Sequence, residues 1–290
     1  MRPPRVPRIN AYVLAADPWW LEESVLSYYD LVDRIVVSYD ADGLSWTGTS
    51  IPVEECLQRI RSIDSAGKCD FRPGQFANPN RQSLDNDTAQ RQVAHAQAAD
   101  GADWIVQIDT DEVLLDGAEL LASIHEADAR GADGVEYPAR FLYTRSASGH
   151  FLEFASPGWR LLTNYPGPVA VRSTARPRHA RQIDGSLYRV DISPNNTDPR
   201  HHYDALVHRV IRPDQAILHY SWVRSDDYMK RKAGWSGHTD TYSEPRQLKA
   251  WRRITRHPFL STAFPRSGAN GEWFRLTKLS PGRTFWRGEQ

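Results

Sequence analysis

Two carboxylates one residue apart, Asp109 and Asp111, follow an apolar run that begins at Trp104, and a third acid, Glu112, comes next. Carboxylates at the end of a buried strand are unfavourable unless they hold a cation or stay solvated. Ligands of open α/β sheets bind at the carboxyl ends of strands. An Asp-x-Asp pair at such a place therefore indicates a seat for Mg²⁺ or Mn²⁺ that carries a phosphorylated ligand.

A histidine late in the chain is the natural third ligand. His219 ends the strand expected within 216–221, and an imidazole joined to two carboxylates suits Mn²⁺ and is tolerated by Mg²⁺. After it, Ser225 caps a helix that carries three cations at 230–232, which would neutralise a diphosphate. The alternatives are a half-buried histidine without a ligand and a solvated basic helix face.

Motifs for other chemistries are lacking. The chain has no Gly-rich phosphate loop and no Gly-x-Ser-x-Gly elbow, which speaks against kinases, ATPases, dinucleotide oxidoreductases and α/β-hydrolases. Cys56 and Cys69 stand in no metal-type spacing and suggest no disulfide framework. No zinc spacing is matched by the remaining candidate histidines, which are His179, His201, His202 and His208.

The composition is that of an ordinary soluble globular protein, with 290 residues of which 40% are hydrophobic and 25% charged. Lys plus Arg and Asp plus Glu both number 36, so no global charge favours nucleic acid or a membrane. The basic start, residues 1–8, lacks the apolar core of a signal peptide, and no apolar run is long enough to span a bilayer. We expect a cytoplasmic protein that binds no nucleic acid.

The elements that position the acids alternate between strand and helix patterns in the first half of the chain. Strands are expected at 9–15, 34–38, 69–71, 104–108 and 134–143, and helices at 21–28, 52–60, 85–99 and 118–129. This order predicts an α/β fold, with a mostly parallel sheet and helices on both of its faces. The acid-bearing strand is the fourth, and its apolar run predicts a central place. From 146 to 212, loops and short antiparallel strands are expected.

Several stretches of this sequence are similar to one family. They are the opening strand, helix and strand around 19–37, the loop 39–45, the segment 90–104, the Asp-x-Asp-Glu string 109–112, and the pair 219–220 with Lys232. On these residues the chain resembles glycosyltransferases of the GT-A fold, family 2 type, especially those with an Asp-x-Asp-Glu motif and a late His-Tyr. The match covers about 8–145 and part of 215–235.

The resemblance implies a GT-A fold and transfer of a sugar, with inversion, from a nucleotide-diphosphate donor such as a UDP- or GDP-sugar to a hydroxyl-bearing acceptor. A divalent cation, Mn²⁺ or Mg²⁺, would act as a Lewis acid on the leaving diphosphate. The implied metal ligands are Asp109, Asp111 and His219. The implied contacts with the nucleotide sugar are Asp40, Arg91, Asp109 and Lys232.

The general base is less defined. Inversion requires a base beside the acceptor hydroxyl, and the Glu-Asp pair that the family usually supplies does not occur in this sequence. Asp184, which precedes a glycine, and Glu153, ahead of a Pro-Gly-Trp-Arg loop, are the candidates. The alternative for each is a solvated loop acid.

The expected domain plan has a flexible start at 1–8, a catalytic domain at 9–240 and an irregular, basic and aromatic extension at 241–290. Within the catalytic domain, 9–145 would bind the donor and 146–240 the acceptor. The extension either touches an anionic membrane or a lipid-linked acceptor, or packs as a helix with solvated arginines.

Two other functions stay open. A sugar-phosphate nucleotidyltransferase also places carboxylates and a metal on an α/β sheet, but it more often has a Gly-rich basic loop where this chain has residues 15–19. A non-catalytic carbohydrate-binding relative is the second, and the 10 Trp and 12 Tyr permit it.

Overall fold

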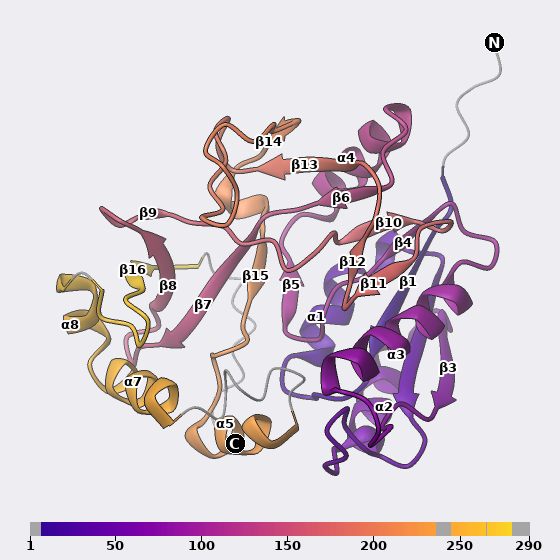
Figure 1. Cartoon of the computed structure of the whole chain (residues 1–290), viewed down its shortest axis with the longest axis horizontal. Coiled ribbons are helices and arrows are strands. Elements are labelled where there is room, and N and C mark those ends of the chain that lie inside the picture. The colour runs from indigo at the N-terminus through magenta and orange to yellow at the C-terminus, as the bar shows by residue number, and fades with distance from the viewer. Residues whose placement is uncertain (1–6, 236–244, 265, 280–290) are drawn as a thin grey trace.

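The computed structural model describes residues 7–235, 245–264 and 266–279 (Figure 1). Within 7–235, eight strands form the larger sheet in the order β14-β13-β6-β10-β4-β1-β2-β3. Their bounds are β1 Ile9–Leu14, β2 Arg34–Asp40, β3 Cys69–Gly74, β4 Trp104–Val106, β6 Gly134–Glu136, β10 Ala170–Arg172, β13 Leu187–Asp191 and β14 Arg209–Val210. In this range five of the seven neighbouring pairs are parallel, and both antiparallel pairs involve β10. The predicted α/β class and the central place of β4 are confirmed.

Helices cover both faces of this sheet, as the alternation of apolar residues along β1 requires. Ile9, Ala11 and Val13 pack in one cluster with α1 (Leu21–Tyr28), α2 (Val53–Ile63) and α4 (Gly117–Ala129). Tyr12 and Leu14 point the other way and pack against α3 (Ser83–Ala98). The predicted helices on both faces are confirmed. A short 3-10 turn, η1 (Tyr29–Leu31), follows α1, and a second, η2 (Pro213–Gln215), precedes the late histidine strand.

A second, mixed sheet lies beside the first (Figure 1). Its order is β16-β8-β7-β15-β5, with β9 paired to β8. The bounds are β5 Glu112–Leu114, β7 Ala139–Arg145, β8 Phe151–Ser156, β9 Arg160–Leu161, β15 Ile217–His219 and β16 Trp273–Thr277. A hairpin of β11 (Pro177–His179) and β12 (Gln182–Ile183) stands apart from both sheets. Because β4 belongs to the first sheet and β5 to the second, the Asp-x-Asp segment lies where the chain passes between them.

The expected strand at 134–143 is wrong as one element. It is two strands, β6 in the first sheet and β7 in the second, which are separated by Tyr137 and Pro138. A proline cannot donate to a strand ladder, so the break falls where the pairing changes sheets. The boundary expected at 145 falls between β7 and β8, which pair with each other.

The expected extension is not irregular where it is described. It forms α7 (Pro245–Arg256), α8 (Pro258–Ala263) and β16, which pairs antiparallel with β8. Of the flexible start expected at 1–8, residues 1–6 lie outside the described residues. The same holds for 236–244, 265 and 280–290, which belong to the expected end of the catalytic domain and to the expected extension. No helix in the described part of the chain is long and apolar enough to cross a bilayer.

Candidate functional site

A cavity of about 220 Å³ opens at the carboxyl ends of β1, β2 and β4 and is closed from the other side by β15 and α5 (Asp226–Trp235). All the residues predicted for metal and nucleotide binding line it: Asp40, Arg91, Asp109, Asp111, His219 and Lys232. These side chains come from parts of the chain as far apart as β2 and α5. The fold therefore gathers the two predicted clusters into one place.

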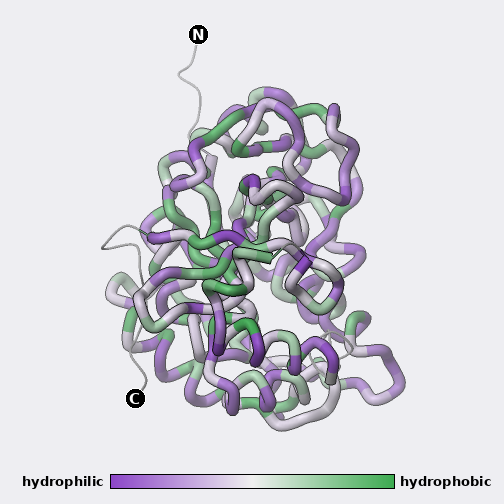
Figure 2. Tube along the Cα trace, turned by 90° about the vertical axis from the view of Figure 1, so that its left-hand side faces the viewer, coloured by the Kyte–Doolittle hydropathy of each residue, from purple (hydrophilic) through white to green (hydrophobic). Residues whose placement is uncertain are grey.

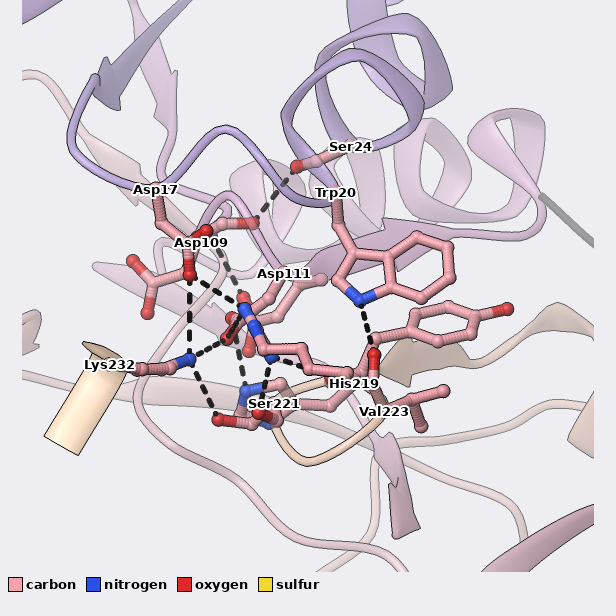
Figure 3. A network of polar contacts seen from close by, with 12 residues as sticks. Asp17, Trp20, Ser24, Asp109, Asp111, His219, Ser221, Val223 and Lys232 are labelled. Atoms are coloured by element: carbon pink, nitrogen blue, oxygen red, sulfur yellow. Dashed lines mark hydrogen bonds and ion pairs between the residues drawn. The ribbon is translucent and has the colours of Figure 1, made fainter. Parts of the chain in front are cut away.

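Asp111 lines this cavity and takes part in a network of polar contacts with residues of several elements (Figure 3). Its Oδ1 is 3.2 Å from His219 Nε2, and its Oδ2 accepts from Lys232 Nζ at 2.8 Å and from Arg224 Nη2 at 3.2 Å. The pairing of β15 with β5, which places His219 opposite Glu112, brings the imidazole there. Burial raises the pKa of Asp111, but Lys232, His219 and Arg224 outweigh burial and hold it well below its usual range.

Asp17 is a second acid that contacts Arg224 and Lys232, and the sequence analysis missed it. Its Oδ2 accepts from Arg224 Nη2 at 2.7 Å and lies 3.7 Å from Lys232 Nζ, while Tyr228 Oη donates to Oδ1 at 2.5 Å. Burial raises the pKa of Asp17, and the attraction of Arg224 and Lys232 lowers it below the usual value. Asp17 lies three residues beyond the end of β1, so the rule of carboxyl ends that singled out Asp109 also points to it.

Asp109 is held by arginines. Arg91 Nη2 donates to its Oδ1 at 2.9 Å, and Arg181 Nη1 lies 3.7 Å from its Oδ2. Its backbone is fixed as well, because Ser24 Oγ donates to its carbonyl and its N–H donates to Glu112 Oε2. Burial raises the pKa of Asp109, and the two arginines lower it below its usual value.

Glu112 and Arg181 form a buried ion pair beneath the cavity. Arg181 donates to both carboxylate oxygens, at 2.6 and 2.7 Å, and also to the carbonyl of Gln107 at 3.0 Å. Arg181 sits in the turn of the β11–β12 hairpin after Ala180, whose φ is +49° and whose N–H donates to Thr88 Oγ1 of α3. Such partners orient the groups that touch a ligand. Sequence reasoning noted Glu112 without a role and missed Arg181.

Asp40 lines the cavity, but its carboxylate binds backbone N–H groups of the neighbouring loops. Its carboxylate accepts from the N–H groups of Asp42 and Leu44, both at 3.1 Å, and of Phe76 at 2.8 Å. A side chain that binds backbone two residues on is a common way of fixing a turn. That loop presents Trp46 to the cavity, where its Nε1 donates to Gln90 Oε1 at 2.7 Å. The nucleoside contact expected of Asp40 stays a prediction.

Of the three cations on α5, only Lys232 lines the cavity. Lys230 is exposed and pairs with Asp226 and Asp227, and Arg231 lies over the ring of Tyr228 at 4.8 Å. The expected cap is present, since Ser225 Oγ accepts from the N–H of Tyr228 at 3.2 Å. The solvated-face alternative therefore holds for Lys230 and not for Lys232.

Neither candidate base lines the cavity. Glu153 on β8 is fully buried and pairs with Arg140, whose Nη2 donates to Oε2 at 2.9 Å. Asp184 is exposed, pairs with Arg178 and lines a different surface pocket together with Asp133. An acid buried as deeply as Glu153 needs its own counter-charge, and a hairpin acid like Asp184 is solvated. The structure does not bring either to the predicted metal site.

The described part of the chain holds no ready-made metal centre, and this applies to Asp109, Asp111 and His219 as well. In the described ranges, no three His, Cys, Asp or Glu side chains are grouped so that they could hold a metal ion. Within the cavity, Asp111 pairs with Lys232, Arg224 and His219, while Asp109 pairs with Arg91 and Arg181. Each acid thus meets cations instead of a second acid.

Comparisons with known proteins give no family. No family model matches the chain, and no curated protein matches it. Among solved structures, the crystal structure of mannose-6-phosphate isomerase from Helicobacter pylori aligns with 14% identity and a TM-score of 0.29. The alignment covers 52% of this chain and 56% of that chain. A likeness this low bears on neither fold nor function.

Proposed function

We propose that this protein is a GT-A glycosyltransferase that uses a divalent cation to transfer a sugar from a nucleotide-diphosphate donor to a hydroxyl-bearing acceptor. One observation carries the proposal: Asp109, Asp111, His219 and Lys232 line one cavity at the carboxyl ends of parallel strands. Open α/β sheets bind nucleotides at such an edge. The resemblance of the sequence to GT-A enzymes points to the same edge.

The donor types in the cavity suit a divalent cation, but the side chains would have to close around it, since they are not grouped as a metal site in this structure. The carboxylate of Asp111 and Nε2 of His219 are 3.2 Å apart, and together with Asp109 they offer the mixed oxygen and nitrogen donors that suit Mn²⁺. His219 Nδ1 is buried and has no hydrogen-bond partner among the described residues, and Nε2 is the ring nitrogen that faces Asp111. When bound, the cation would stabilise the negative charge on the leaving diphosphate.

The chain's own groups supply the remaining features of a nucleotide site. Lys232 adds a positive charge for phosphate oxygens on the α5 side. Arg91 Nη1 is buried without a hydrogen-bond partner in the described part of the chain, although its other nitrogens bind Asp87 and Asp109. A buried unpaired donor beside a cavity suits a polar ligand atom. Trp46 and Trp235, which line the same cavity, offer ring faces to a base or a sugar.

Exchange of Asp111 for Asn tests the metal assignment. We expect the variant to lose Mn²⁺-dependent binding of UDP or GDP by more than about 100-fold, since the loss of supporting groups alone typically lowers metal affinity by about 10–100-fold. Calorimetry with each nucleotide, with and without Mn²⁺, measures this. Intact, metal-independent nucleotide binding by Asp111→Asn would contradict the metal assignment.

A second assay separates glycosyl transfer from its rivals. With Mn²⁺, we expect the wild-type protein to release nucleoside diphosphate from a sugar nucleotide, slowly with water and faster with an acceptor. Release of pyrophosphate from a nucleoside triphosphate and a sugar phosphate would identify a nucleotidyltransferase instead. Binding without either release would identify a non-catalytic relative.

A further inference from the structure

Three large apolar side chains are exposed within six residues near the C-terminal end of the described chain. Phe259 and Leu260 on α8 are 53% and 58% exposed, and Phe264, which follows α8, is 62% exposed. Figure 2 looks onto the side of the molecule that carries α7, α8 and β16. Single exposed apolar residues are ordinary, but bulky ones gathered in this way mark an interaction surface.

The neighbouring helix α7 packs on the second sheet and leaves these side chains exposed. Trp251 and Ile254 of α7 are buried in a cluster with Tyr143 and Phe274, and Trp251 Nε1 donates to the Tyr143 carbonyl at 3.2 Å. The packing alternative of the sequence analysis therefore holds for α7. The loop after α8 is tied back as well, because Ser267 Oγ donates to the carbonyl of Ser261 at 2.7 Å.

The surroundings of the three side chains are strongly basic. The described residues 245–264 and 266–279 contain eight Lys and Arg residues against one acid, Glu272. Three of these cations, Arg253, Arg256 and Arg266, are exposed within a few residues of α8. This excess selects a negatively charged partner.

A second exposed apolar pair elsewhere lacks this charge. Tyr203 and Leu206 are 67% and 70% exposed, but the acids Asp198 and Asp204 balance Arg200 of their loop, and Arg209 at the start of β14 pairs with Glu119 and Glu126. The combination of exposed apolar side chains with a cationic rim therefore distinguishes α8 from this loop.

We propose that α8 and Phe264 dock this protein on the surface of an anionic lipid bilayer. The three apolar side chains would enter the boundary between headgroups and acyl chains, and the arginines beside them would meet lipid phosphates. Two weak signals of this kind together give stable yet reversible attachment, whereas either alone is marginal. The inference does not depend on the proposed function, because it uses none of the residues of the cavity.

Sedimentation of the full chain with lipid vesicles tests this surface. We expect binding to vesicles that contain about 30 mol% phosphatidylglycerol, and little binding to phosphatidylcholine alone. Phe259→Ser combined with Phe264→Ser should weaken binding about tenfold or more, since each ring loses its apolar burial. Arg256→Gln should weaken it about fivefold, the effect of one cation near such a surface.

Tyr203→Ser combined with Leu206→Ser is the matched control and should bind like the wild type. The exchanged Phe side chains are exposed, so the double Phe variant should unfold at the wild-type temperature, which thermal unfolding checks. Equal binding by the two double variants would overturn the proposal, as would no binding of the wild type to anionic vesicles. A self-associated wild type that becomes monomeric in the double Phe variant would also overturn it, and would assign the surface to a second copy of the chain.

Discussion

The two halves of the chain bring opposite charges to the cavity. The acids all come from the first half, up to β4 and the turn after it: Asp17, Asp40, Asp87, Asp109 and Asp111. The basic side chains that touch Asp17, Asp109 or Asp111 come, apart from Arg91, from the second half: Arg181, His219, Arg224 and Lys232. Neither half alone would neutralise its own buried charges. The site therefore forms only when the irregular half folds onto the regular one.

The difference also assigns different tasks to the two acids of the Asp-x-Asp pair. Asp109 is fixed by Arg91 and by Arg181, and its backbone is tied to α1. Asp111 meets Lys232 and Arg224 through Oδ2 and His219 through Oδ1 (Figure 3). If a divalent cation binds, it must displace positive charge from Asp111. The two acids thus differ in their partners: Arg91 and Arg181 support Asp109, whereas under the proposed function Lys232 would give up its contact with Asp111 when a cation binds.

Removal of the supporting cation should have the largest effect. Arg181→Met leaves Glu112 buried and unpaired, and breaking a buried ion pair from one side lowers the free energy of unfolding by about 3–5 kcal/mol. Urea unfolding at neutral pH measures the loss. Arg178→Met is the matched control, since Arg178 lies exposed on the same hairpin and should change stability by no more than about 0.5 kcal/mol. Equal losses in the two variants would remove the distinction between supporting and surface cations.

Removal of Lys232 should have a smaller effect, and it should raise the affinity for Mn²⁺ instead of lowering it. Lys232→Met removes the shorter of the two contacts on Asp111 Oδ2, at 2.8 Å, and leaves that of Arg224, so Mn²⁺ alone should bind more tightly. The expected gain is about tenfold or more, since a hydrogen bond to a charged group contributes about 1.5–3 kcal/mol and about 1.4 kcal/mol corresponds to tenfold. Nucleotide binding in the presence of Mn²⁺ should weaken, because a phosphate partner is lost.

Calorimetry with Mn²⁺ alone and then with UDP or GDP separates these two effects. Lys230→Met is the control on the same helix, since Lys230 is exposed and pairs with Asp226 and Asp227. It should leave both affinities unchanged. Unchanged Mn²⁺ affinity in Lys232→Met would mean that the lysine supports Asp111 and does not compete with a cation.

The first half of the chain can be predicted from the sequence better than the second, because its elements follow local apolar patterns whereas the second half contributes side chains through contacts with distant residues. Apolar periodicity places β1, α1 and β4 within a few residues, and the position of Asp111 after a buried strand needs no knowledge of its partners. Arg181 meets Glu112 across 69 residues, and Arg224 meets Asp111 across 113. No local pattern marks an arginine in a turn as the partner of a distant acid. Asp17, unlike these arginines, could have been predicted from the sequence, because it follows β1 at the carboxyl end of a strand.

The strand expected at 134–143 shows the limit of periodicity. Its apolar residues continue through Tyr137, so the pattern alone reads as one strand. The chain nevertheless leaves the first sheet there, because Pro138 cannot donate to a ladder and β7 pairs with β15 and β8 in the second sheet. Sheet membership depends on distant partners, and those partners are not written in the local sequence.

The smallest effect should come from Asp184, the acid that the sequence offered as a base. It is exposed, pairs with Arg178 on the β11–β12 hairpin and lines a pocket other than the cavity. We expect Asp184→Asn to change sugar transfer by less than about twofold and stability by less than about 0.5 kcal/mol, as for surface exchanges generally. Rates of nucleoside diphosphate release with an acceptor, measured beside Asp111→Asn, check the first figure.

The division of charge between the halves makes this small effect informative. Every acid that lines the cavity comes from the first half, so a reacting acid at position 184 would be the exception. It could reach the cavity only if the hairpin moved, and the hairpin is held by Arg181 on Glu112 and by the N–H of Ala180 on Thr88. A loss of transfer above about 100-fold in Asp184→Asn, with nucleotide binding intact, would therefore require those contacts to break during the reaction, because losses of that size follow from removing a group that acts in proton transfer.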